Sequence, residues 1–170
     1  MRIKLIQIII ILLFFSLISI KPCFSKKKLT KSISKITKII YHYYDSSVPP
    51  KFHRSYTITV TSDRVRIIVD SYGEIINDKE FEADSNQFEM IKKSLRINKI
   101  QKGKKIESKG CTGGTGEKIE YFENDNTLFS ASVYHCGNKY YGDMKGNIDN
   151  VANDIKHLIP NFIELLKRDN

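Results

Sequence analysis

Two neighbouring segments with alternating side chains constrain the fold of this chain most. In residues 55–60 every second side chain is apolar, and residues 64–70 continue the pattern after a turn at Ser62 and Asp63. A period of two is typical of a strand with one buried face. The sequence therefore predicts an antiparallel hairpin that contributes one face to a hydrophobic core.

The residues after this hairpin predict more short strands and then a helix. Turns are expected at residues 72–74 and again at Asn77 and Asp78, which makes the region a meander of short antiparallel strands. Asp84 is a good N-cap residue, and Gln87 completes a capping-box-like pair with it. A helix is therefore expected to begin directly after Asp84.

The second half shows a similar order of elements. Strands are expected at residues 117–123 and 127–136, a short strand near Tyr140, and a helix with apolar residues from Ile148 onward that Pro160 ends or kinks. Runs of hairpins followed by helices predict an α+β fold, an antiparallel sheet with helices packed on one face. The opposite face is then expected to be open.

The two halves are similar enough to suggest a duplication. Laying Gly73 on Gly137 also lays apolar helix positions on one another, which indicates tandem βββα units at residues 55–97 and 117–166. Chance similarity is the alternative interpretation. The stretch of residues 98–109 is interpreted as a solvated, mobile link between the halves. In architecture alone, such a sheet resembles secreted tandem-repeat inhibitor modules.

The N-terminus has the order of a secretory signal. Arg2 and Lys4 precede an apolar run at residues 5–20, and the small side chains of Cys23 and Ser25 follow. As a helix the run reaches about 24 Å, less than the roughly 30 Å of a hydrocarbon core. Cleavage after Ser25 is expected, which leaves an exported, periplasmic or extracellular protein with no permanent membrane span. Lipidation of Cys23 and an uncleaved anchor are the alternatives.

Three regions follow from this reading: a signal peptide at residues 1–25, a basic segment with a proline-rich loop at 26–54, and an α+β domain at 55–170. The signal carries three basic residues and no acid, so cleavage lowers the formal net charge from +9 to +6. The remaining lysines are scattered among acidic residues, and export removes the protein from most nucleic acid. Nucleic acid is therefore not a predicted partner.

Cys111 and Cys136 are the cysteines that remain after cleavage, and an oxidising compartment favours a disulfide between them. Folding a hairpin about Asn124 and Asp125 places Cys136 opposite Gly113, which is close to Cys111. The sequence therefore predicts one structural bridge.

No motif predicts catalysis, a metal or a cofactor. The glycine-rich residues 110–116 lack the Gly-Lys-Ser/Thr ending of a nucleotide loop, and a strand follows them instead of a helix. His135 precedes Cys136 in a strand, so the two side chains point to opposite faces. The four histidines show no paired spacing of the kind that binds metal.

The most distinctive segment is a proline-stiffened loop around Pro49 and Pro50. A stiff loop loses little entropy on binding, which suits recognition of a partner. A buried connection is the alternative interpretation. The predicted binding residues are Lys51, Phe52, His53, Arg54 and Tyr56.

These features favour a non-enzymatic binding or inhibitor-like module that acts on a protein or cell-envelope component through its open sheet face and this loop. The alternative is a small envelope hydrolase that uses His53 with Asp45 or Asp70, although no nucleophile elbow surrounds the nearby serines. A purely structural surface protein is a third hypothesis.

Overall fold

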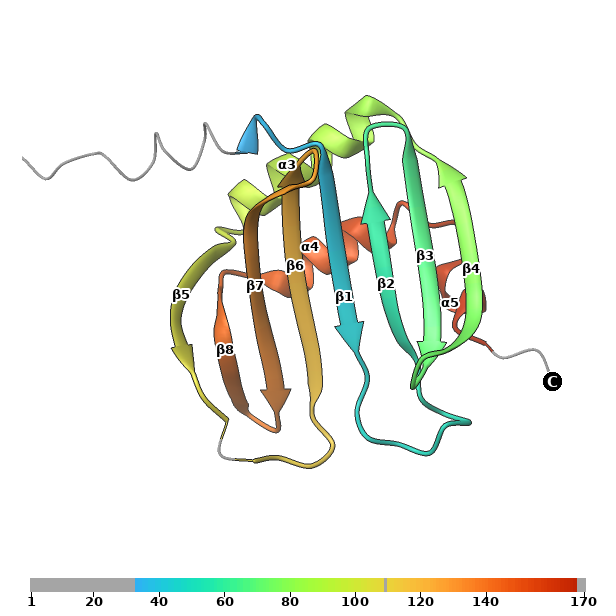
Figure 1. The fold of residues 1–170 in the computed structure, drawn as a ribbon, viewed down its shortest axis with the longest axis vertical. Coiled ribbons are helices and arrows are strands. Elements are labelled where there is room, and N and C mark those ends of the chain that lie inside the picture. Colours follow the sequence, from blue (N-terminus) through green and yellow to red (C-terminus); the bar gives the residue numbers. More distant parts are fainter. Residues whose placement is uncertain (1–32, 109, 168–170) are drawn as a thin grey trace, which may run out of the picture. The chain divides into compact units, whose positions relative to one another are not determined.

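The computed structural model describes residues 33–108 and 110–167, which form one eight-stranded antiparallel sheet in the order β4-β3-β2-β1-β6-β7-β8-β5 (Figure 1). Its strands are β1 (Lys38–Tyr44), β2 (Ser55–Val60), β3 (Arg64–Ser71), β4 (Glu74–Glu82), β5 (Gln101–Ile106), β6 (Thr115–Glu123), β7 (Asn126–Cys136) and β8 (Lys139–Lys145). The described helices are α3 (Ser85–Ile97), α4 (Ile148–Lys156) and α5 (Phe162–Leu165).

The predicted signal peptide at residues 1–25, with Cys23 inside it, lies outside the described residues. Within residues 33–108 and 110–167, no helix is both long enough and apolar enough to cross a membrane.

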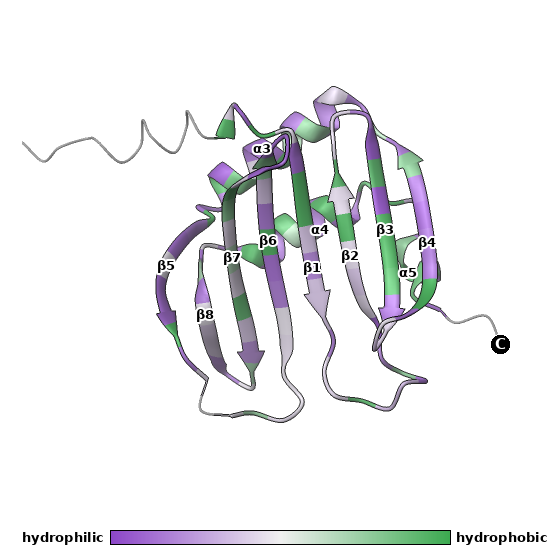
Figure 2. Cartoon of the chain, in the orientation of Figure 1, coloured by the Kyte–Doolittle hydropathy of each residue, from purple (hydrophilic) through white to green (hydrophobic). Residues whose placement is uncertain are grey.

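One face of the sheet carries the core, as the alternating pattern predicts. Figure 2 shows hydrophobic and hydrophilic residues alternating along the central strands, and Figure 1 shows the helices together behind the sheet. Ile39, Ile58 and Ile67 come from three adjacent strands and are each 0% exposed. The fold is therefore an antiparallel sheet with its helices on one face, and the α+β prediction is confirmed at this level.

Helix α3 begins where its cap predicts. The Asp84 side chain accepts a hydrogen bond from the backbone N–H of Gln87, and the Gln87 side chain accepts one from the N–H of Asp84. Phe88, Ile91 and Leu95 follow one another on a single helical face and are buried. The capping box and the apolar stripe together fix where α3 starts and which side packs on the sheet.

One predicted turn is wrong, because its residues lie inside strand β4. The turn at Tyr72 and Gly73 is present, with φ of 54° and 91°, but no turn occurs at Asn77 and Asp78. Both residues lie inside β4 and pair with β3, and the Asp78 carboxylate forms two hydrogen bonds to Arg66. Cross-strand pairing therefore overrides the local turn preference of Asn-Asp.

The interpretation of residues 98–109 as a mobile link is wrong, because strand β5 lies within them. Its residues pair with β8 and form one edge of the sheet. The sequence did not predict β5 because the strand has no apolar alternation. An edge strand that is exposed on both sides does not need it, and its lysines discourage pairing with another chain. The strand precedes β6 in the chain yet lies beyond β8. The tandem βββα arrangement is not confirmed by this order, and it stays a prediction.

The β6–β7 hairpin turns where it was predicted but pairs in a different register. Asn124 occupies the turn with φ of 55°. The register shifts between Tyr121 and Phe122, so that His135 lies opposite Thr115. A β-bulge of this kind adds one residue to one strand, and the residues around it do not predict it.

Cys111 and Cys136 form the predicted disulfide, with 6.2 Å between their Cα atoms. Because of the bulge, Cys136 is one position away from its expected place opposite Gly113. The glycine-rich connection before β6 absorbs this difference, since Gly110 and Gly113 both adopt positive φ.

The buried tyrosines predict a loss of stability at alkaline pH. Burial raises the pKa of Tyr121 from 10.0 to about 12, and the side chain is 2% exposed. A raised folded pKa stabilises the protein fully below the unfolded pKa, and this contribution is lost as the pH rises through the folded pKa. Near pH 11 the loss is about 1.4 kcal/mol for this one residue.

The change that tests this is Tyr121→Phe, which removes the ionisable group and keeps the ring stacked on Phe129. Urea unfolding measured between about pH 9 and about pH 12 is expected to show a shallower decline for the variant than for the parent chain. Equal declines would show that Tyr121 does not resist ionisation.

Candidate functional site

The loop between β1 and β2, residues 45–54, is closed at its base by hydrogen bonds. The Asp45 carboxylate accepts from the backbone N–H of Ser46 and from that of Arg54, at 2.8 Å in each case. The N–H of Asp45 donates to Ser55 Oγ at 3.0 Å. One aspartate thus joins the two ends of the loop.

The outer part of the same loop is tied to the β3–β4 turn. Tyr72 OH donates to the carbonyl of Val48 at 2.6 Å, and Ser71 Oγ donates to the carbonyl of Pro50 at 2.9 Å. Within the loop, the N–H of Phe52 donates to the carbonyl of Pro49 at 2.8 Å. The backbone is therefore held at its base and along its length, in addition to the stiffness that its two prolines supply.

Of the five predicted binding residues, the structure places three in supporting positions. His53 is 5% exposed and its ring stacks on Tyr72 with 3.9 Å between centroids. Arg54 donates from Nε to the carbonyl of Leu166 at 2.6 Å. Tyr56 is 5% exposed, and its ring stacks on the ring of Tyr43. These three side chains hold the loop and the core.

The other two residues, Lys51 and Phe52, form the loop tip. The Phe52 side chain is 65% exposed, and Lys51 is also exposed, with its Nζ 5.9 Å from the centre of the Phe52 ring. Tyr72, which braces the loop, is 57% exposed. The apolar ring of Phe52 is therefore exposed to solvent on a loop whose backbone is fixed by hydrogen bonds.

The contacts of His53 give the hydrolase alternative no support. Its Nε2 lies 3.4 Å from Ser55 Oγ, and its Nδ1 is buried with no hydrogen-bond partner among the described residues. The Asp45 carboxylate accepts two backbone N–H groups, and Asp70 accepts the N–H of Gly73. Neither acid orients the imidazole, so an acid–histidine pair is not assembled here, and the hydrolase reading stays a prediction.

The open face of the sheet carries charges that are already paired. Arg66 forms a salt bridge with Asp78, and Lys118 forms one with Glu120 at 2.9 Å. His42 also contacts Glu120, at 3.2 Å. Burial lowers the pKa of His42 and acts more strongly than the Glu120 contact, which raises it. Burial would raise the pKa of Glu120, but hydrogen bonds from Lys118 and other neighbours hold it below its usual range. This face is polar and internally compensated, and docking on it stays a prediction.

A second feature, which the sequence did not reveal, is a hydrogen-bonded chain of three side chains on the helix-facing side of the sheet. Tyr41 OH donates to Glu117 Oε1 at 2.5 Å, and His135 Nε2 lies 2.8 Å from Glu117 Oε2. Glu117 is 6% exposed. Burial, and then the charge of Glu117, raise the pKa of Tyr41.

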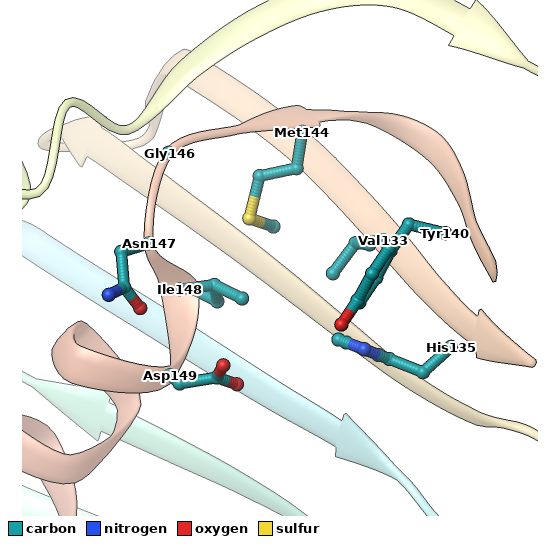
Figure 3. Close-up of a pocket in the computed structure, with 8 residues that line it drawn as sticks. All are labelled: Val133, His135, Tyr140, Met144, Gly146, Asn147, Ile148 and Asp149. Atoms are coloured by element: carbon teal, nitrogen blue, oxygen red, sulfur yellow. The ribbon is translucent and has the colours of Figure 1, made fainter. Parts of the chain in front are cut away.

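This chain of side chains ends at a cavity that His135 lines (Figure 3). The Nε2 of His135 faces Glu117 Oε2, and this contact fixes the orientation of the imidazole ring beside the cavity. In the part of the chain that the structure describes, no serine, threonine, cysteine or lysine lines the cavity. The arrangement presents a carboxylate, an imidazole and a phenol to a ligand, from Asp149, His135 and Tyr140.

Among residues 33–108 and 110–167, no group of three or more histidine, cysteine, aspartate or glutamate side chains is placed to hold a metal ion. Comparisons of the chain with protein-family models, with curated proteins and with solved structures found no match.

Proposed function

We propose that the chain is an exported, non-enzymatic binding module that holds a protein partner against its loop tip, Lys51 and Phe52. One observation carries the proposal: a phenylalanine that is 65% exposed stands on a loop whose backbone is tied down along its length. Most of the energy of a protein interface comes from a few large side chains that enter pockets on the partner. Because the loop is already fixed, binding does not have to order its backbone, and this part of the entropy cost is avoided.

The surroundings of Phe52 define the kind of partner. Lys51 adds a positive charge beside the ring, and Tyr72 adds a second exposed aromatic surface. A complementary surface combines an apolar pocket for the ring with acidic groups at its rim. An exported protein meets such surfaces on other exported or envelope proteins, and the Cys111–Cys136 disulfide suits an oxidising compartment.

Site-specific crosslinking tests the proposal. A photoreactive phenylalanine analogue is placed at position 52, and in a second protein at position 90. Met90 is the matched control, because it is also 65% exposed but lies on α3. Illumination in the native host is expected to give a discrete protein adduct from position 52 and none from position 90. The same adducts from both positions, or no adduct from position 52, would count against the loop tip.

A further inference from the structure

A cavity of about 380 Å³ lies between the C-terminal end of β7, strand β8 and the start of α4 (Figure 3). Its volume falls within the range of small-molecule sites in proteins. The residues that line it are Val133, His135, Tyr140, Met144, Gly146, Asn147, Ile148 and Asp149.

Apolar and aromatic groups form one part of the cavity wall. Met144 and Ile148 line it together with Val133, and Figure 3 shows the Met144 thioether directed into the space. Tyr140 meets His135 edge to face with 5.2 Å between ring centroids, yet the tyrosine remains 64% exposed. A ligand therefore finds an apolar surface and the free face of an aromatic ring.

The charge of the cavity is negative. The carboxylate of Asp149 turns toward the space in Figure 3 and has no hydrogen bond or ion pair among the described residues. Glu117 lies behind His135, and none of the described residues that line the cavity is a lysine or an arginine. The N-terminus of α4 contributes roughly half a positive charge, which the full charge of Asp149 exceeds. Asp149 itself is exposed and lies in the first turn of α4.

We propose that this cavity binds an organic cation, an ammonium group on a small apolar body. The ammonium pairs with the Asp149 carboxylate, and the ring of Tyr140 lines the other side of the same cavity, where it offers an aromatic face to the ligand. The apolar body lies against Met144 and Ile148. The site shares no residue with the loop tip, so this inference stands or fails independently of the proposed function.

Methionine methyl NMR provides the test, because Met144 lines the cavity and Met90 lies elsewhere, exposed on α3. Protein labelled with ¹³C at the methionine methyl groups is titrated with benzylamine, benzyl alcohol and benzoate. These probes share one ring and differ in charge. Benzylamine is expected to shift the Met144 signal saturably and to leave Met90 unchanged. Equal affinity for benzyl alcohol, or equal shifts at both methionines, would overturn the proposal.

Variants at Asp149 separate charge from shape. Asp149→Asn keeps the size of the side chain and is expected to weaken benzylamine binding about tenfold, because a charge-assisted hydrogen bond is lost. Asp149→Glu is expected to retain much of the affinity. Asp125→Asn, in the turn at the far end of the β6–β7 hairpin, is the control and should bind as the parent does. Unchanged affinity in a folded Asp149→Asn protein would exclude the ion pair.

The same chemistry occurs in free amines and in lysine side chains of peptides. Nα-acetyl-lysine amide is therefore titrated beside benzylamine. Tighter binding of the lysine derivative assigns the site to a peptide, and tighter binding of benzylamine assigns it to a free amine. Failure of both cations to shift Met144 would contradict the inference.

Discussion

Replacing Ile39 by alanine is expected to lower the free energy of unfolding by about 4 kcal/mol, whereas the same change at the neighbouring Ile40 should cost about 1 kcal/mol. Ile39 lies in the central strand β1, is 0% exposed and faces the helices. Its replacement leaves a cavity between layers that cannot close around it. Ile40 is partly exposed on the open face, so little apolar area is lost there.

This pair is a sharp control because the two residues have the same side chain, the same strand and adjacent positions. Urea unfolding of the two variants, followed by circular dichroism, gives both free energies, and similar m-values would show that the unfolded states are comparable. Equal losses at Ile39 and Ile40 would mean that both faces of the sheet are covered, and the one-sided arrangement would have to be abandoned.

Removing the disulfide should have the next largest effect. Replacing both Cys111 and Cys136 by serine is expected to lower the free energy of unfolding by about 3.5 kcal/mol. The two cysteines are 25 residues apart, and the bridge restricts the unfolded chain by closing a loop of that length. The folded hairpin that carries Cys136 keeps its strand pairing to β6, so most of the change comes from the unfolded state.

Reduced parent protein provides the control for this experiment. Unfolding of the parent in the presence of a reductant should follow the curve of the double serine variant, and unfolding of the oxidised parent should occur at higher urea. If the serine variant is as stable as the oxidised parent, the bridge does not stabilise the fold. If reductant does not alter the parent, the two thiols are not joined.

The elements that the sequence predicted correctly are those specified by nearby residues. Strands β2 and β3 follow from alternation within one hairpin, and α3 follows from Asp84 and Gln87, which are three positions apart. In each case the residues that fix the element contact one another within a few positions of the chain. Local pattern is then sufficient to locate the element.

The elements that the sequence missed depend on distant partners. Strand β5 is a strand only because β8 lies beside it, and Asp78 remains in β4 because Arg66 pairs with it. The bulge between Tyr121 and Phe122 changes the register of a hairpin whose turn was correctly placed. None of these features has a signature in the residues immediately around it.

The candidate sites divide in the same way. The proline-rich segment identified the loop, but the sequence could not show which of its side chains are exposed. The His53 ring stacks on Tyr72, and Arg54 donates to the backbone carbonyl of Leu166. The cavity was missed because no motif marks its lining residues, which come from β7, β8 and the start of α4 and meet only in the folded chain. Tyr41 and Glu117, the side chains linked to His135 behind it, are 76 positions apart. Single-sequence reasoning has no means of pairing such residues.

The most direct test of the account is the dissociation constant of the crosslinked partner, once purified, for three forms of the protein. Phe52→Ala is expected to weaken binding about thirtyfold, the loss of roughly 2 kcal/mol that a central aromatic contact supplies. Met90→Ala, with the same initial exposure of 65%, should bind as tightly as the parent. Unchanged affinity of a folded Phe52→Ala protein would contradict the proposal that the loop tip holds the partner.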